Sequence, residues 1–413
     1  MPLPDPRVAT SGTSDAYRGI AGLAESGLWD QIIDDIDGRR IRIGDRWLVD
    51  FASCNYLGLD LDPQIADAIE PMVRRWGTHP SWSRMLGSPR AYPMIEERLT
   101  ALLGAPDTLV LPTISQIHLS VIPALAERGH ILIDARAHRT VYDGCVYARG
   151  RGATLRRFRA GDLGHLAELL AGTPAGGPLL VCVDGVNSMT GNTPDLRGLA
   201  DLCRRHGAIL YVDDAHGFGV IGERAAGDPT PYGTKGNAIV RHHDAGYDNI
   251  VLVGGFSKAY SSLLAFVACA TPIKNHLKVA AAPYLYSGPV PTASLATVLA
   301  GLDVNETRGD ELRTTLFRLT RRVLDHLAGL GVSTPNESGF PLVEVPLRSA
   351  EDLPVVARKL LDRGVYATLA PYPGVPREDV GFRIQLTAAH TDEQIDGLLG
   401  VLSDLAEPAL RPR

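Results

Sequence analysis

Residues 208–223 read AILYVDDAHGFGVIGE, and the prediction of the fold starts from this stretch. A short aliphatic run ends at Asp213 and Asp214, and a glycine-rich segment follows. Apolar runs of this length that close on a turn are typical of strands buried on both faces of a sheet. Because ligands collect at the carboxyl ends of such strands, the residues around Asp213 are the first candidates for a binding site.

Similar segments recur on both sides of this stretch and predict a mainly parallel central sheet. The other strand candidates are residues 108–112, 131–134, 179–184, 249–255 and 264–269. Helical patterns separate many of these segments, and such alternation indicates an α/β domain with helices on both faces of the sheet. We expect this large domain to cover residues 56–294.

Two smaller regions flank the large domain. Residues 1–55 are expected to form an N-terminal arm, a helix over 16–36 and a hairpin over 39–51 with its turn at Gly44 and Asp45. From residue 295 a long helical pattern precedes the strand candidates 340–347, 365–369 and 382–388 and a closing helix from Thr391. We therefore expect a smaller C-terminal α+β domain over residues 295–413.

The composition excludes several classes of protein. The 413-residue chain has a formal net charge of -6, whereas a surface that binds nucleic acid needs an excess of Lys and Arg. Its cysteines include no CxxC pair, so we expect neither a disulfide framework nor a metal site. No apolar run approaches the ~18–20 residues that span a bilayer. A cytoplasmic enzyme that binds no nucleic acid and no membrane is the expectation.

Two strand ends carry groups that suit an aldehyde cofactor with a pyridine ring. Lys258 follows the strand candidate 249–255 among small and hydroxyl residues, and a lysine beside a phosphate can form a Schiff base with an aldehyde. Asp213 could pair with a protonated pyridine nitrogen, which keeps the ring able to accept electrons from a carbanion. His216, three residues later, could hydrogen-bond a phenolic oxygen of the ring.

Two further strand ends add a hydroxyl and an aromatic ring. Ser188 lies in the loop after Asp184, where it could contact the ring oxygen, although this loop also reads as a simple turn. His138 follows the strand candidate 131–134 and could stack on a cofactor ring. Each of these signals is weak alone, since a lysine after a strand is usually a solvated surface residue. Their common order and their placement at successive strand ends make the combination specific.

At this point the sequence resembles the α-oxoamine synthases, a pyridoxal-5′-phosphate family of fold type I. The family includes 8-amino-7-oxononanoate synthase, 2-amino-3-ketobutyrate CoA ligase and serine palmitoyltransferase. The matching stretches run from FASCNYLGLDLDPQI (51–65) to FRIQLTAAHTDEQID (382–396). VDDAHGFGVIGE and RIQLTAAHT are the most family-specific of them.

The resemblance implies a role for each candidate residue. The catalytic residues would be Lys258, His138 and His216, and the cofactor would be bound by Lys258, Asp213, His216, Ser188, His138, Thr113, Ile114, Ser257 and, from a partner subunit, Ser287. The substrate would be bound by Asn55, Arg383 and Arg84, with Arg383 clamping the amino-acid carboxylate through its planar guanidinium. A homodimer with its active site at the subunit interface is also implied.

Three segments depart from the family pattern. Thr113 and Ile114 stand where the family has a Gly-aromatic pair that receives the phosphate, and His118 is unexpected in the same loop. Gly255 stands where many members have a phosphate-binding threonine. The segment 77–92 keeps a Ser-Arg pair but gains Trp82 and prolines. These changes surround the substrate pocket and leave the acyl donor open.

The resemblance predicts a transferase that condenses an amino-acid-derived carbanion with an acyl thioester, carried on coenzyme A or on a carrier protein, to give an α-amino ketone. Two alternatives stay open at this point. The enzyme could use the same cofactor on another electrophile or for β- or γ-carbon chemistry, such as γ-elimination of a sulfonium amino acid like S-adenosylmethionine followed by C–C coupling. The chain could also be a non-catalytic homologue that binds a partner.

Overall fold

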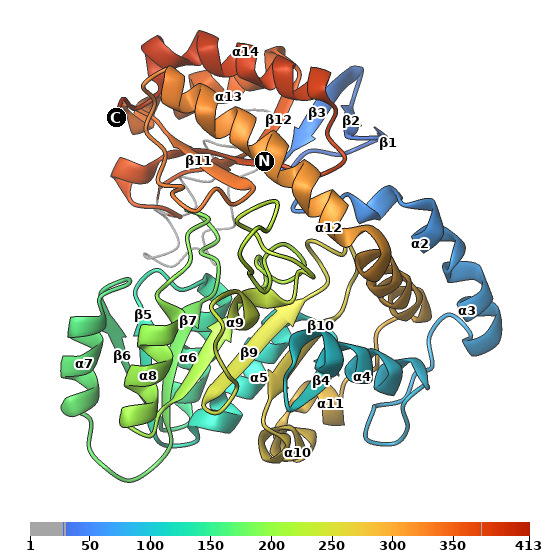
Figure 1. The fold of residues 1–413 in the computed structure, drawn as a ribbon, viewed down its shortest axis with the longest axis vertical. Helices are drawn as coiled ribbons and strands as arrows, with labels where there is room; N and C mark the ends of the chain where they lie inside the picture. The colour runs from blue at the N-terminus through green and yellow to red at the C-terminus, as the bar shows by residue number, and fades with distance from the viewer. Residues whose placement is uncertain (1–27, 29, 373) are drawn as a thin grey trace, which may run out of the picture. The chain divides into compact units, whose positions relative to one another are not determined.

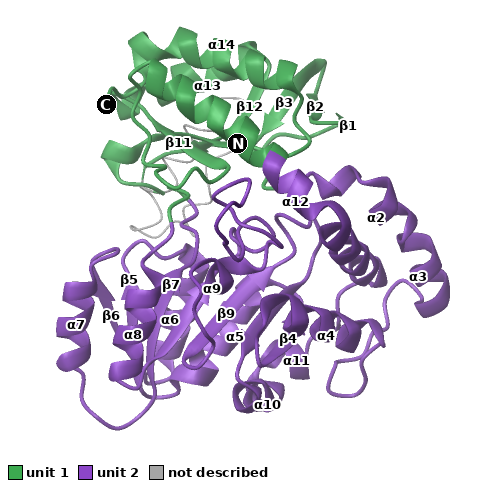
Figure 2. Cartoon of the chain, viewed as in Figure 1, with its two compact units in different colours: residues 1–54, 189–192, 315–413 green, residues 55–188, 193–314 purple. Residues whose placement is uncertain are grey.

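The computed structural model describes residue 28 and residues 30–372 and 374–413. These residues divide into two compact units (Figure 2). The large unit comprises residues 55–188 and 193–314, and the small unit comprises the described residues up to 54 together with 189–192 and 315–413. Each unit is described by itself.

The large unit is built on a seven-stranded sheet with the order β4-β10-β9-β8-β7-β5-β6 (Figure 1). The strands are β4 (Asp107–Leu111), β5 (His130–Asp134), β6 (Thr154–Phe158), β7 (Leu179–Asp184), β8 (Ile209–Asp213), β9 (Ile250–Gly255) and β10 (Ala265–Cys269). The pairs from β6 to β9 are parallel, and β10 runs antiparallel to both of its neighbours. The predicted α/β fold with a mainly parallel central sheet is confirmed.

Helices cover both faces of this sheet (Figure 1). They include α4 (Ala91–Leu103), α5 (Ile114–Ala126), α6 (Arg139–Gly150), α7 (Leu163–Ala171), α8 (Leu196–Arg205), α9 (Ala238–His242), α10 (Thr271–Ala280) and α11 (Ala282–Leu285), and α2 (Pro63–Asp67) and α3 (Ile69–Trp76) precede them. Buried side chains of α5 and α6 pack on the strand residues of one face in a continuous apolar core. The strand β6 was missed because its exposed arginines interrupt the apolar run expected of a buried strand.

The small unit contains a six-stranded sheet with the order β1-β2-β3-β12-β13-β11. Its strands are β1 (Asp35–Asp37), β2 (Arg40–Ile43), β3 (Arg46–Phe51), β11 (Leu342–Pro346), β12 (Val365–Ala370) and β13 (Gly381–Gln385), and its helices are α13 (Leu353–Asp362) and α14 (Asp392–Ala409). The predicted hairpin is β2–β3, with Gly44 at a positive φ of 58° in its turn. The predicted start of α14 is a capping box between Thr391 and Gln394.

The units differ from the expected domains in several places, and residues 189–192, expected in the large domain, belong to the small unit. The strand β3 pairs in parallel with β12, so the N-terminal hairpin joins the C-terminal strands in the small unit. The long helix α12 (Thr292–Gly329) is divided between Thr314 and Thr315, whereas the expected boundary lay at residue 295.

The helix expected over 16–36 is wrong where the structure describes it. Its first part, up to residue 27, lies outside the described residues. Residues 30–34 form no helix, β1 begins at Asp35, and Ile32 and Ile33 are exposed. The segment is extended because the Asp34 amide donates to Arg42 O and the Asp34 carboxylate accepts the Gly44 amide across the hairpin. Within the described ranges, no helix has the length and apolarity needed to cross a membrane.

Candidate active site

A cavity of about 210 Å³ lies at the carboxyl edge of the sheet in the large unit. It is lined by Thr113, Ile114, Ser115, His138, Thr140, Asp184, Val186, Ser188, Asp213, Ala215, His216, Ser257 and Lys258. Residues from five separate segments therefore meet there because each follows the end of a strand in one sheet. The lining includes the candidates at the four strand ends singled out in the sequence, together with the Thr113 loop.

Asp213, the last residue of β8, is buried at one wall of this cavity. Its Oδ1 accepts the Ala215 amide at 3.1 Å, and its Oδ2 lies 3.0 Å from His118 Nε2. Burial alone would raise the pKa of Asp213, but His118, assisted by Lys258 and His138, lowers it to about 2. Asp213 is therefore a carboxylate at neutral pH, as a partner for a cationic ring nitrogen must be.

The two neighbouring acids have the opposite character. Asp214 is fully buried, and its burial raises the pKa to about 8, although its Oδ2 accepts the Ile239 amide at 2.8 Å. Burial and the charge of Asp213 raise the pKa of Asp184 well above its ordinary range, and its Oδ1 accepts the His138 amide at 2.9 Å. Of these three carboxyl groups, the surroundings keep only Asp213 anionic.

The two histidines of the cavity are held by neighbouring hydroxyl groups. His138 is the N-cap of α6, and its Nδ1 lies 2.8 Å from the Thr140 hydroxyl and accepts the Thr140 amide at 3.3 Å. His216 Nδ1 lies 2.7 Å from the hydroxyl of Tyr56, whose side chain is fully buried. Tyr56 is a contact that the sequence reasoning missed, although it stands beside Asn55 in the quoted CNYLGL motif.

The N-terminal end of α5 forms another part of the cavity lining. Thr113 caps this helix by accepting the Gln116 amide at 3.3 Å, and Ile114 and Ser115 follow in its first turn. A Cβ at Gly255 would lie 2.4 Å from Ile114 Cδ1. Gly255 and Ile114 are therefore linked departures from the family pattern, because the isoleucine side chain occupies the space that a threonine at 255 would need.

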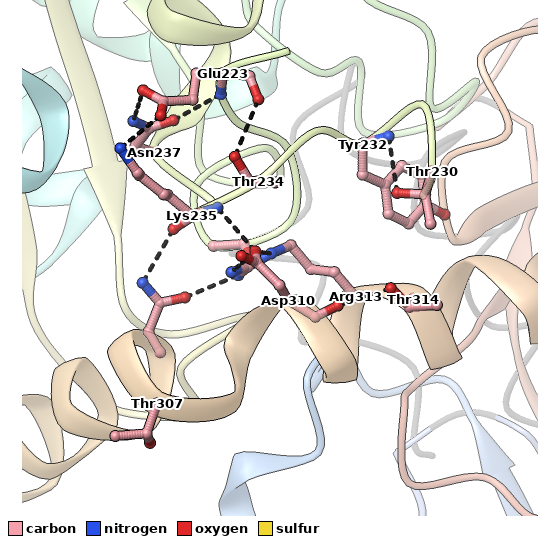
Figure 3. Close-up of polar contacts among 12 residues, drawn as sticks. Glu223, Thr230, Tyr232, Thr234, Lys235, Asn237, Thr307, Asp310, Arg313 and Thr314 are labelled. Atoms are coloured by element: carbon pink, nitrogen blue, oxygen red, sulfur yellow. Dashed lines mark hydrogen bonds and ion pairs between the residues drawn. The ribbon is translucent and has the colours of Figure 1, made fainter. Parts of the chain in front are cut away.

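A polar network around Arg313 includes Asp310 and the Lys235 amide (Figure 3). Arg313 of α12 is almost fully buried, and its Nη1 donates to Gly219 O at 3.0 Å and to Asn305 Oδ1 at 2.8 Å. Asp310 Oδ1 accepts from Arg313 Nη2 at 2.6 Å and from the Lys235 amide at 2.9 Å. The helix thereby anchors both the loop that carries His216 and the loop around Lys235, where φ is +64°.

The remaining predicted residues do not line this cavity. Asn55 Oδ1 accepts from Ser261 Oγ at 3.1 Å, so it braces the turn after Lys258. Ser287 follows Tyr286 at the rim of a separate surface groove. In the small unit, Arg383 lies on β13 with its Nη1 3.7 Å from Met189 Sδ.

Arg84 requires a correction. It is buried, its Nη1 donates to Glu96 Oε1 and to Val110 O at 2.8 Å, and its guanidinium lies 4.3 Å from the Tyr92 ring centre. These contacts link α4 to β4 inside the fold. The predicted role of Arg84 in substrate binding is not supported, because its Nε and Nη1 donate to groups within the large unit.

The donor set of the cavity fits pyridoxal phosphate. A primary amine for the aldehyde is supplied by Lys258, a buried carboxylate for the ring nitrogen by Asp213, and a flat ring by His138. The first turn of the 13-residue helix α5, together with Ser257, offers amide and hydroxyl donors for a phosphate. Each chemical group of the expected cofactor thus finds a complementary group on the cavity wall.

Comparisons with known proteins agree on one family. The family model for aminotransferase class I and II matches residues 47–402. The chain is 35% identical to an 8-amino-7-oxononanoate synthase from Chromohalobacter salexigens, over 85% of this chain and 87% of that protein. It is 34% identical to the enzyme of the same name from Alkalilimnicola ehrlichii, over 94% and 96%. A solved structure of SPT with its PLP internal aldimine superposes with a TM-score of 0.86 at 25% identity, over 96% and 98%.

Proposed function

The chain belongs to the class I and II aminotransferase family, as an α-oxoamine synthase, and we propose that it joins an amino acid to an acyl thioester to form an α-amino ketone. It is a transferase of fold type I, and its cofactor is pyridoxal 5′-phosphate. The proposal rests on one observation: Lys258 and the anionic Asp213 line the same cavity, together with His138 and His216.

In this proposal each cavity residue contacts a different part of the cofactor. Lys258 holds the aldehyde carbon and Asp213 the ring nitrogen, while His138 stacks on the ring. His216 and Ser188 contact the ring oxygen. The phosphate is bound at the first turn of α5 and at Ser257, by Thr113, the amides of Ile114 and Ser115, and the Ser257 hydroxyl. Ser287 of a partner subunit completes the phosphate site.

When bound, pyridoxal phosphate supplies an electron-withdrawing ring that stabilises negative charge at the amino-acid α-carbon. Lys258 would hold the aldehyde of the cofactor, and its amine would move the proton at that carbon. Asp213 keeps the ring nitrogen positive, because its carboxylate stays ionised throughout the physiological range. Arg383 binds the substrate carboxylate, and Asn55 orients the turn after Lys258 through its bond to Ser261.

The acyl donor is a thioester, on coenzyme A or on a carrier protein. A substrate screen tests the reaction in two stages. Incubation of the holoenzyme with glycine, alanine or serine in heavy water is expected to exchange the α-proton of one of them, and replacement of Lys258 by Ala is expected to stop this exchange. Acyl thioesters of coenzyme A and of a carrier protein are then added to the active amino acid. Absence of any α-amino ketone with every thioester would contradict the proposed reaction.

The alternatives weighed from the sequence receive no support. The relatives named above are synthases, and none points to γ-elimination from a sulfonium amino acid. Membership in a family of enzymes, with the full donor set in place, also argues against a non-catalytic homologue.

We propose in addition that the enzyme acts as a homodimer. Leu119, Tyr147 and Tyr286 are exposed apolar side chains, with exposed fractions of 44%, 53% and 80%, and they line a single groove with Pro283 and Ser287. Burial of these side chains against a second copy would remove them from water. Replacement of Tyr286 by Glu is expected to shift the protein toward the monomer in sedimentation velocity. If the unmodified protein itself sediments as a monomer, the proposed dimer is contradicted.

A further inference from the structure

His118 is a buried histidine that the proposed mechanism does not use. It occupies the fifth position of α5, and its side chain is fully buried. Burial of a polar ring costs free energy unless its nitrogens are hydrogen-bonded. A histidine at this depth therefore has to be explained by the groups around it.

Both ring nitrogens of His118 have partners on β8. Its Nε2 lies 3.0 Å from Asp213 Oδ2, and its Nδ1 lies 2.8 Å from the hydroxyl of Tyr211. Tyr211 is also fully buried, and it stands two residues before Asp213, so both side chains point to the same face of the sheet. The three groups form a continuous chain that ends at the cavity wall.

The direction of the hydrogen bond between His118 and Asp213 follows from the charge of Asp213. Burial raises the pKa of the Tyr211 phenol well above the ordinary value, so the hydroxyl keeps its proton. Among the residues that the structure describes, the hydrogen-bond partner of this hydroxyl is His118 Nδ1. An ionised carboxylate can only accept, so His118 Nε2 donates to Asp213 Oδ2, and the Tyr211 hydroxyl donates to Nδ1 when that nitrogen carries no proton.

We propose that His118 is a positioning residue for the cofactor: it holds the Asp213 carboxylate ionised and aligned for the ring nitrogen. The Ala215 amide occupies Oδ1 and His118 occupies Oδ2, so both oxygens receive a donor from the protein. The carboxylate cannot rotate without breaking one of these bonds. This inference rests on the proposed function, because it takes Asp213 as the partner of the ring nitrogen.

The packing around His118 supports a positional role. A Cβ at Gly144 of α6 would lie 2.4 Å from His118 O, so α6 crosses α5 in close contact at this residue. Ile114, which lines the cavity, lies one turn earlier on α5 and on the same face as His118. One helix therefore contributes to the phosphate end of the cavity and supports its carboxylate end.

Two substitutions at position 118 separate hydrogen bonding from packing. In H118Q the amide nitrogen can reach the place of Nε2, whereas H118L fills the space without a donor. We expect H118L to raise the dissociation constant for pyridoxal phosphate about 10- to 100-fold, which corresponds to loss of a hydrogen bond to a buried charge. H118Q is expected to stay within about threefold of the unmodified protein, and Y211F, which removes the outer donor, to lie between them.

The absorbance of the bound cofactor gives a second measurement. A positive ring nitrogen favours loss of the Schiff-base proton, so a weakened Asp213 is expected to move the pH midpoint of the visible absorbance upward in H118L and not in H118Q. Urea unfolding of each apoprotein reports whether the variants fold. If H118L matches the unmodified protein, or if H118Q is impaired as strongly as H118L, the inference is overturned. If the unmodified protein itself fails to bind pyridoxal phosphate, the proposed function has failed instead.

Discussion

The two ends of the cavity are built in different ways. At the carboxylate end, Asp213 is held by hydrogen bonds from His118 and the Ala215 amide. At the phosphate end, the notable relation is steric: the side chain of Ile114 occupies the space beside Gly255. At the carboxylate end Asp213 stands in the motif of the family and only its partner His118 departs from the pattern, whereas the phosphate end departs by two compensating changes at Ile114 and Gly255. The difference indicates that the need for a charged partner restricts the residues at the carboxylate end. At the phosphate end, side chains can be exchanged for others that fill the same space.

The largest effect is expected from removal of the charge at the carboxylate end. D213N keeps the shape of the side chain but removes its charge, so the ring nitrogen loses its anionic partner. We expect turnover to fall about 10²- to 10³-fold, the usual cost of one preorganised electrostatic contact. Steady-state kinetics of the holoenzyme measure the effect. A matched control is D214N, since Asp214 is kept neutral by burial, and equal losses in both variants would contradict the distinction.

The next largest effect tests the steric pairing at the phosphate end. G255T places a Cβ into Ile114 and is expected to destabilise the protein by about 1–3 kcal/mol, as overpacked cores do. The double variant I114G/G255T removes the clash and is expected to recover much of this stability. Urea unfolding of the single and double variants gives the coupling energy. Additive losses would show that the two positions are independent.

The smallest expected effect is on the pH dependence of stability, and it contrasts Asp214 with its neighbour Asp213. The folded-state pKa of Asp214 is about 8, well above the ~3.9 of an unfolded aspartate, so the folded protein binds the extra proton between these values. Stability from this group is full below pH 4 and is lost as the pH rises toward 8, at up to about 1.4 kcal/mol per pH unit. Unfolding measured from pH 6 to 8 should show a shallower decline in D214N. An identical slope in both proteins would remove Asp214 as its source.

Much of the cavity could be predicted because its chemistry follows strand order. His138, Ser188, Asp213 and Lys258 come after successive buried strands, and parallel strands bring their carboxyl ends to one edge. The strand β6 was missed because its exposed arginines break the apolar pattern. The helix expected over 16–36 was wrong in its described part, residues 30–36, because pairing across the hairpin overrides a short helical pattern.

The contacts that were missed all depend on tertiary neighbours. His118 was noticed as an unexpected residue, but only the packing of α5 against β8 brings it to Asp213. Tyr56 is far from His216 in sequence, so no local spacing could place its hydroxyl at Nδ1. Arg84 matched a family pair, yet the buried Glu96 on α4 takes its guanidinium. Sequence patterns therefore located reactive groups better than the groups that support them.

Lys258 is expected to bind the cofactor covalently within the cavity that contains Asp213. Reduction of the holoenzyme with borohydride, followed by peptide mapping by mass spectrometry, tests it directly. The lysines of the chain are Lys235, Lys258, Lys274, Lys278 and Lys359, so the labelled peptide is unambiguous. We expect a phosphopyridoxyl group on Lys258 alone. A label on another lysine, or none on a protein saturated with pyridoxal phosphate, would contradict this expectation.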